Sequence, residues 1–597
     1  MLTLSATRKQ QIIKWGSITM TIRLRNTTAL VLIVGTWLLA AGSSAPSSPA
    51  EDNSRVIEAT KARIHTFGQL MDTVWNLSSN GDVGEYLRFP QGGRYEVVVR
   101  ARGSVAQGRW PIAAIKLDDE MLTTFSVPRT DLGDYRKTIE VPAGAHTLTV
   151  AFTNDLLTAT EDRNLYLERI TVRAAAGEAK PQLSNPAELQ AAYQEREQQA
   201  LARAAESAEK VRKGDAVIEV RDNAGRPVAD ASVAVAQTRH DFLFGCNIYM
   251  FDRFQADKDN DEYKRRFADL FNYATTGFYW RSYEPERGKP MYDYTDRVVV
   301  WCREHGIRVK GHPLLWGEQA GIPRWSKGQP SAELRKQRVQ EIMRRYHGKI
   351  ELWEVVNEPS HLREPNVAEC YPWAREPDAT ATLIINDYHV LADGAPGFFA
   401  LLKGAIAQNV PFDGIGIQAH EPRTMRFSLD RSWRILDRYA SLGKQLNITE
   451  FTPASGDQPV TGPFAQGKWD EATQAEWAEK FYRLCFGHPA MVAITWWDLC
   501  DRGSWLKGGG LLRADLSPKP AYTALQRLIH EEWWTKIEGR TNGRGVFPFR
   551  GYYGDYRVTV KTPDGRLTQT DFHLSKAGPS RLTLTLGAAI KRVSPNQ

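Results

Sequence analysis

The sequence predicts a multidomain protein in which a (β/α)8 TIM barrel follows a β-sandwich and is flanked by a second, smaller β-sandwich. A chain of 597 residues with 42% hydrophobic content is too long for one core. Apolar segments of strand length alternate with segments of helix length eight times between residues 240 and 535. Short β-rich segments separated by turn residues lie on both sides of this region.

The chain begins with a basic segment that is followed by an apolar one. Residues 29–41 form an apolar run that is too short to span a bilayer, and small residues follow it at 42–45. The basic residues are Arg8, Lys9, Lys14, Arg23 and Arg25. We therefore expect residues 1–45 to be a signal peptide, the mature chain to be secreted or periplasmic, and no membrane contact after removal of the peptide.

The net charge excludes one class of partner. The formal charge is +7, and the first 45 residues hold five basic residues and no acidic ones, so the rest of the chain carries +7 − 5 = +2. Because most of the net positive charge lies in the predicted signal peptide, we expect no nucleic-acid partner.

Residues 55–175 are expected to form the first β-sandwich. Residues 95–102, 112–117 and 146–152 are β-rich and are separated by Gly, Pro and Asp turns. In one later loop, Asp155, Asp162 and Asn164 offer oxygen ligands to a hard cation. The same residue types also form turns and caps, so both interpretations stay open here.

Two further regions separate and flank the barrel. Residues 183–213 are rich in Ala, Glu and Gln and predict a helical linker that acts as a spacer or packs on a neighbouring domain. Residues 214–239 predict a β-hairpin, and residues 545–597 show a similar pattern of short β-rich segments. Because neither segment can form a core alone, we expect them to pair into one small sandwich.

Two of the expected barrel strands end in a glutamate. The strands are expected at residues 242–246, 274–280, 307–312, 350–357, 381–386, 414–420, 445–450 and 492–497. Because the C-terminal ends of parallel barrel strands share one face, Glu358 and Glu450 are expected to face each other. Two strand-end carboxyls on one face indicate glycoside hydrolysis, in which one carboxyl must be protonated and the other ionised. The alternative is that a single glutamate is more often on the surface or in an ion pair.

These segments resemble glycoside hydrolase family 10, the retaining β-1,4-xylanases, over roughly residues 240–535. The resemblance lies in Trp353–Glu358 and Ile448–Glu450, and it continues in Gly311–Trp316, Asn386–Tyr388, Gly414–His420 and Trp497–Tyr522. Their order and spacing together make the resemblance specific.

The resemblance implies roles for individual residues. Glu358 would be the acid/base and Glu450 the nucleophile, about 5 to 5.5 Å apart, with a covalent glycosyl-enzyme and no cofactor for catalysis. The residues expected to bind substrate are Asn357 at the hydroxyl beside the anomeric carbon, His420, which would position the nucleophile, with Gln418 beside it, and His312 and Trp505 at the walls of the reacting subsite. For the two histidines, a core histidine bonded to backbone remains the alternative.

The sequence departs from the family where the xylanases bind the next sugar on the non-reducing side. Residues 275–280 are two residues shorter than in the family, and Tyr279 stands at the position of a lysine. Gly317 replaces a second histidine. We expect Phe278 and Tyr279 to present aromatic surface there, which weakens binding of plain xylose.

The N-terminal region resembles the calcium-dependent xylan-binding modules of carbohydrate-binding families 36 and 60. The resemblance lies in residues 108–111, 152–155 and 161–167. It implies that this domain binds glycan and that calcium is held at Asp155, Asp162 and Asn164.

The sequence therefore predicts retaining hydrolysis of a β-1,4-linked polysaccharide, xylan or a related β-glycan, which would be the main binding partner. One alternative is a hydrolase of a different or decorated β-glycan. Another is a glycan-binding protein without turnover, which the presence of both glutamates argues against.

Overall fold

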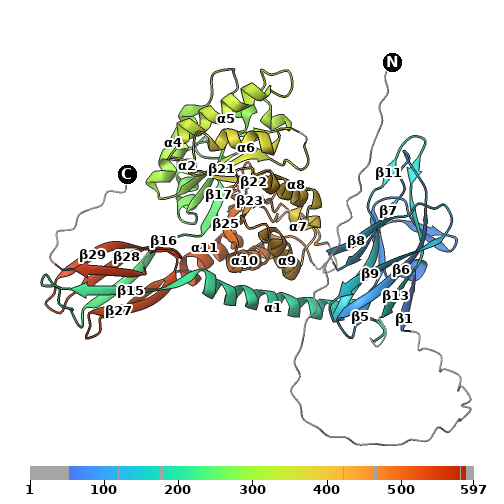
Figure 1. Ribbon diagram of the computed structural model, residues 1–597, viewed down its shortest axis with the longest axis horizontal. Helices are drawn as coiled ribbons and strands as arrows, with labels where there is room; N and C mark the ends of the chain where they lie inside the picture. Colours follow the sequence, from blue (N-terminus) through green and yellow to red (C-terminus); the bar gives the residue numbers. More distant parts are fainter. Residues whose placement is uncertain are drawn as a thin grey trace, which may run out of the picture. The chain divides into compact units, whose positions relative to one another are not determined.

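The computed structural model describes residues 53–118, 120–174, 179–362, 364–420, 423–461, 467–578 and 580–586. The predicted signal peptide at 1–45 lies outside these residues. The described chain forms a β-sandwich, a long helix, a barrel and a second sandwich (Figure 1).

Eight parallel strands close into a barrel in the described part of residues 243–496, and this confirms the predicted fold class. In ring order they are β17 (Leu243–Asn247), β18 (Tyr273–Gly277), β19 (Arg308–His312), β21 (Leu352–Asn357), β22 (Thr382–Asp387), β23 (Gly414–Ile417), β24 (Gln445–Phe451) and β25 (Met491–Trp496). Pairing of β17 with both β18 and β25 closes the ring. The short β20 (Leu315–Trp316) pairs with the end of β21.

Helices surround the strands in Figure 1 and bury their outer faces. The longer helices of the barrel region are α2 (Asp257–Ala268), α4 (Tyr292–Glu304), α5 (Ala332–Tyr346), α6 (Val367–Arg375), α8 (Pro396–Ala407), α9 (Leu429–Ala440), α10 (Glu471–Gly487) and α11 (Pro520–Arg527). Side chains of Ser331, Ser428 and Asp470 cap α5, α9 and α10 by accepting bonds from backbone N–H groups of the first turn.

The second predicted strand was too long. The strand expected at 274–280 ends at Gly277, and Trp280 begins the short helix α3 (Trp280–Tyr283). The Trp280 indole is buried and donates to Glu284 in the next turn, at 2.7 Å. The chain turns at Tyr279 because the Trp280 side chain packs into the core beside the strand rather than along it.

The first sandwich consists of two antiparallel sheets. One has the order β3 (Gln69–Met71), β4 (Val74–Leu77), β13 (Leu165–Ala174), β6 (Gly93–Gly103), β9 (Gly133–Val141), with β1 (Ser54–Glu58) against β13. The other has the order β14 (Gln182–Leu183), β5 (Gly81–Phe89), β10 (Gly144–Phe152), β7 (Ile112–Leu117), β8 (Glu120–Ser126), with β2 (Ile64–His65) against β5. Alternate residues of β6, from Tyr95 to Ala101, are fully buried between the sheets.

Helix α1 (Pro186–Val211) is capped at its N-terminus by Asn185, whose side chain accepts from the Glu188 N–H. Its small residues Ala200, Ala204 and Ala208 are buried against the barrel. A Cβ added to Gly487 at the end of α10 would lie only 2.3 Å from the Ala204 carbonyl oxygen. Small residues on both helices therefore allow their backbones to approach closely.

The second sandwich uses strands from both sides of the barrel sequence, which lie side by side in Figure 1. One sheet has the order β27 (Val546–Tyr552), β15 (Lys213–Arg221), β30 (Arg581–Thr585). The other has the order β26 (Lys536–Arg540), β16 (Ser232–His240), β28 (Gly554–Lys561), β29 (Leu567–Leu574). The predicted hairpin at 214–239 is therefore wrong. Strands β15 and β16 lie in different sheets, because each buries its apolar face only against the opposite sheet.

Candidate active site

Glu358 is the first residue after β21. Its φ of 55° is a left-handed conformation that residues other than glycine rarely adopt. Its N–H donates to the Asn386 carbonyl at 3.0 Å, and Pro359, which has no N–H, follows it. The strand therefore stops here, and the Glu358 carboxyl lies at the C-terminal mouth of the barrel.

The Glu358 carboxyl has an environment that suits a general acid. Burial raises its pKa, the negative charges of Glu450 and Asp387 add to this effect, and hydrogen bonds from Gln418 and Trp316 offset only part of it. Gln418 Nε2 donates to Oε1 at 2.9 Å, and Trp316 Nε1 donates to Oε2 at 3.1 Å. A raised pKa keeps a larger fraction of this carboxyl protonated near neutral pH.

Glu450 near the end of β24 is held by two nitrogen atoms. Asn386 Nδ2 donates to Oε1 at 3.0 Å, and His420 Nε2 lies 2.8 Å from Oε2. The other ring nitrogen of His420 lies 3.0 Å from Thr452 Oγ1, which can donate to it when the imidazole is neutral. These bonds fix the orientation of a carboxylate that is almost fully buried.

Asn386, at the end of β22, connects two of the predicted site residues. Its Nδ2 donates to Asn357 Oδ1 at 2.9 Å as well as to Glu450, and its Oδ1 accepts from the Thr449 hydroxyl. The ends of β21, β22 and β24 are thereby tied together. Asn357 is positioned by this contact and lines the cavity above the barrel.

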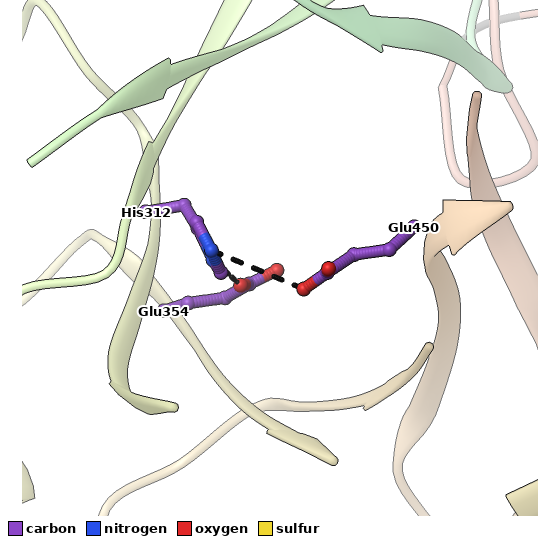
Figure 2. A group of neighbouring side chains, drawn as sticks. All are labelled: His312, Glu354 and Glu450. Atoms are coloured by element: carbon purple, nitrogen blue, oxygen red, sulfur yellow. Dashed lines mark hydrogen bonds and ion pairs between the residues drawn. The ribbon is translucent and has the colours of Figure 1, made fainter. Parts of the chain in front are cut away.

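His312 at the end of β19 is fully buried between two carboxylates, as Figure 2 shows. Its Nδ1–H donates to Glu354, and its Nε2 lies 3.9 Å from Glu450 Oε1. The Tyr279 hydroxyl lies 3.0 Å from the same Nε2 and donates to it when the ring is neutral. His312 therefore lies beside Glu450, and both of its nitrogen atoms have protein partners.

The cluster of His312, Glu354 and Glu450 has donor atoms close enough to suit a metal ion. However, the Lys310 ammonium already pairs with Glu354, and both side chains are buried. Burial raises the pKa of Glu354, but its interactions with Lys310 and His312 outweigh this effect, so the pKa lies below its ordinary value. We interpret the cluster as an ion-pair network that orients His312.

A cavity of about 1,110 Å³ lies over these residues. Tyr279, Trp316, Trp497 and Trp505 provide its aromatic surface, and Trp505 is 53% exposed. Its other lining residues include Asn357, Glu358, Gln418, His420 and Glu450, together with Glu318, Tyr388, His389 and Arg423. This volume and aromatic lining suit a carbohydrate chain.

The three predicted metal ligands lie together in the first sandwich, around the hairpin of β11 (Leu156–Leu157) and β12 (Asp162–Arg163). The Oδ1 atoms of Asp155, Asp162 and Asn164 are all buried and have no hydrogen-bond partner among the described residues. Their remaining polar groups are bonded: Asn164 Nδ2 donates to Asp162 Oδ2 at 2.7 Å, and Ser79 donates to Asp155 Oδ2 at 2.9 Å. Unpaired buried oxygens of this kind fit a hard cation.

Comparison with known proteins identifies the family. Residues 236–528 match the family model described as Glycosyl hydrolase family 10, and residues 96–184 match one described as a Ca-dependent, xylan-binding carbohydrate-binding module. An endo-1,4-beta-xylanase of Agaricus bisporus is 30% identical over 285 residues, which are 43% of this chain and 82% of the relative. This chain belongs to glycosyl hydrolase family 10.

Some relatives of this family 10 chain are much longer than the matched part. Anti-sigma-I factor RsgI6 of Acetivibrio thermocellus is 29% identical over 59% of this chain, and Endo-1,4-beta-xylanase 2 of Arabidopsis thaliana is 26% identical over 58%. The chain covers 45% and 32% of these two relatives, less than half of each. The solved xylanase 10B of Thermotoga petrophila, in complex with xylobiose, is 25% identical with a TM-score of 0.42, covering 49% of this chain and 95% of that one.

The structure corrects part of the prediction for residues 275–280, where the family 10 domain departs from the xylanases. Tyr279 lines the cavity, but Phe278 does not. Phe278 is fully buried, with its ring against Tyr283, Tyr346 and Trp353. Phe278 and Tyr279 lie just after the end of β18 and point in different directions, so of the two only Tyr279 faces the cavity.

The glycine at the position of the family's second histidine also has a structural explanation. A Cβ added to Gly317 would lie 2.4 Å from the Glu364 carbonyl oxygen and 2.9 Å from the Leu362 side chain. The loop after Glu358 therefore occupies the space that a side chain at 317 would need. Recovering the histidine would require this loop to move.

Some residues of the family 10 site were missed by the sequence analysis. Asn386 was noted only as part of a motif, and no role was predicted for Glu354, Lys310 or Arg423. The signal for Lys310 and His312 was their spacing of two in a strand, which places both side chains on one face. Their contact with Glu354 becomes visible only once β19 is paired with β21.

Proposed function

We propose that the chain is a retaining glycoside hydrolase that cleaves β-1,4-linked xylan or a related β-glycan. The observation that carries this proposal is the pair of unlike carboxyl environments at one barrel mouth. Glu358 has a raised pKa, whereas Glu450 accepts hydrogen bonds on both oxygens. Such a difference assigns the acid and the nucleophile.

The reaction follows from these positions. Protonated Glu358 gives its proton to the glycosidic oxygen as the bond to the anomeric carbon breaks, and Glu450 attacks that carbon to form a glycosyl-enzyme. Ionised Glu358 then takes a proton from water, which displaces Glu450 and restores both carboxyls. Asn386 and His420 hold Glu450 in line for the attack.

Two variants test these roles. Glu450→Ala should lose turnover on all substrates, whereas Glu358→Ala should keep the first step on aryl glycosides, because a good leaving group needs little protonation. Glu351→Ala is the matched control, since this exposed glutamate lies just before the opposite end of the same strand. Equal loss on both substrate types, or a product released with α configuration in early NMR spectra, would refute the assignment.

For the first sandwich we propose glycan binding with calcium at Asp155, Asp162 and Asn164. The three unpartnered oxygens support this, and a bound ion would supply positive charge to which sugar hydroxyls can coordinate. Calorimetric titration with soluble xylan should show binding that a chelator abolishes and that Asp162→Ala removes. Asp131→Ala is the control, because Asp131 is exposed and paired with Arg129. Binding that survives chelation would exclude the ion.

We also propose that the protein is exported. The support is the order of basic, apolar and small residues in the first 45 positions. Among the described residues, no helix has both the length and the apolar character needed to cross a membrane. Fractionation of cells that express the full chain should place the shortened protein outside the cytoplasm, and a full-length cytoplasmic product would contradict this.

A further inference from the structure

Arg423 lies at the edge of the active-site cavity, in the segment between β23 and α9. It is exposed, and its guanidinium carbon lies 5.0 Å from the centre of the Trp505 ring. Among the residues that the structure describes, it is the only arginine or lysine that lines this cavity. It also has no carboxylate partner in the described part of the chain.

Other arginines near this side of the barrel are paired. Arg426, three residues further on, bonds to Glu476 and Glu197, and Arg502 bonds to Asp259. Among the described residues, Arg423 instead packs against an aromatic face. Stacking on Trp505 holds the planar group in place but leaves its N–H edge free, and this edge matches the two oxygens of a carboxylate.

The position of Arg423 relates it to the reacting sugar. The Trp505 ring centre lies 4.5 Å from that of His420, and His420 Nε2 lies 2.8 Å from the nucleophile Glu450. Arg423 is therefore two side chains away from the carboxylate that attacks the anomeric carbon. A group that reaches Arg423 must belong to the sugar beside Trp505 or to its neighbour.

The charges around the cavity are arranged asymmetrically. Glu318, the exposed carboxylate of the lining, follows β20, which lies beside β21 and across the ring from β24 and β25. Arg423 follows β23, and Trp505 follows β25. Because Trp505 follows β25, across the ring from Glu318, an anionic substituent beside Trp505 lies near Arg423 and on the side away from that carboxylate.

We propose that Arg423 binds the carboxylate of a uronic acid branch, so that the preferred substrate is an acidic, decorated β-1,4-xylan rather than the plain chain. The proposal rests on the proposed glycosidase function and specifies its substrate class. Plain xylan has no anionic group that would occupy the unpaired guanidinium.

The test is binding of two oligosaccharides with the same xylose backbone, one with a uronic acid branch and one without. Affinity is measured by calorimetry on the full chain carrying Glu450→Ala, so that no turnover occurs. Wild type at position 423 should prefer the acidic ligand about tenfold at low salt, and the preference should shrink as salt rises. Arg423→Gln should abolish the preference, and Arg423→Lys should keep part of it.

Arg287→Gln is the matched control, because Arg287 is an exposed arginine stacked on Trp325, 5.5 Å from the ring centre, outside this cavity. The comparison of the two glutamine variants also removes any contribution from the first sandwich. Equal affinity for both ligands, or equal loss in both variants, overturns the proposal. Hydrolysis of the neutral oligosaccharide by the unmodified enzyme separately tests the proposed function, so the two can fail independently.

Discussion

Replacing Tyr279 by lysine should improve action on plain xylo-oligosaccharides. Tyr279 lines the cavity where the resemblance to the xylanases implies a lysine, and its hydroxyl is bonded to His312 Nε2 at 3.0 Å. A charged hydrogen bond from the new ammonium to a sugar hydroxyl gains about 1.5 to 3 kcal/mol. Loss of the phenol to imidazole bond costs about 1 kcal/mol.

The difference, roughly 0.5 to 2 kcal/mol, corresponds to about a 2- to 30-fold increase in kcat/KM. The assay compares xylotriose and xylotetraose with other β-linked oligosaccharides of equal length. Tyr279→Phe is the control, since it removes the hydroxyl without adding a charge and should gain nothing. If the unmodified enzyme already prefers plain xylo-oligosaccharides strongly and the lysine variant gains nothing, the altered subsite has been misinterpreted.

Two further predictions concern charges in the barrel. Replacing Gln418 by Met removes a hydrogen bond that stabilises ionised Glu358, so the pKa of Glu358 should rise further. The alkaline limb of the pH profile of kcat/KM should then move to higher pH. An unchanged limb would argue against Glu358 as the acid. Lys310→Met should destabilise the barrel by about 3 to 5 kcal/mol in denaturant unfolding, because Glu354 stays buried without its cation, and adding Glu354→Gln should restore most of the loss. Equal stability of the single and double variants would contradict the ion-pair interpretation.

The raised pKa of Glu358 also links stability to pH. Its contribution to stability is fully present below the pKa of an unfolded glutamate, about 4.3, and is lost as pH rises through the higher value in the folded protein. The acid that the reaction needs therefore lowers the stability of the barrel at neutral pH. This agrees with the usual cost of a site built for chemistry rather than for packing.

The sequence by itself determined the architecture and the placement of two glutamates at one face of the barrel. Each strand is a local pattern of apolar residues, and the residue at its end can be read without knowing the neighbours. Closure of parallel strands into a barrel then places all such ends on one face, so Glu358 and Glu450 meet regardless of their separation in sequence. Asp155 and Asp162 could be grouped in advance for a different reason, because they lie close together in the sequence in one loop region.

Only the tertiary structure decided the contacts between strands and the direction of side chains at strand ends. Lys310 meets Glu354 because β19 pairs with β21, and the register of that pairing is not a local property. Phe278 and Tyr279 point in different directions because the chain turns where β18 ends. Strands β15 and β16 lie in different sheets because each buries its apolar face against the opposite sheet. These outcomes depend on which surfaces are buried together, and a pattern along the chain carries no such information.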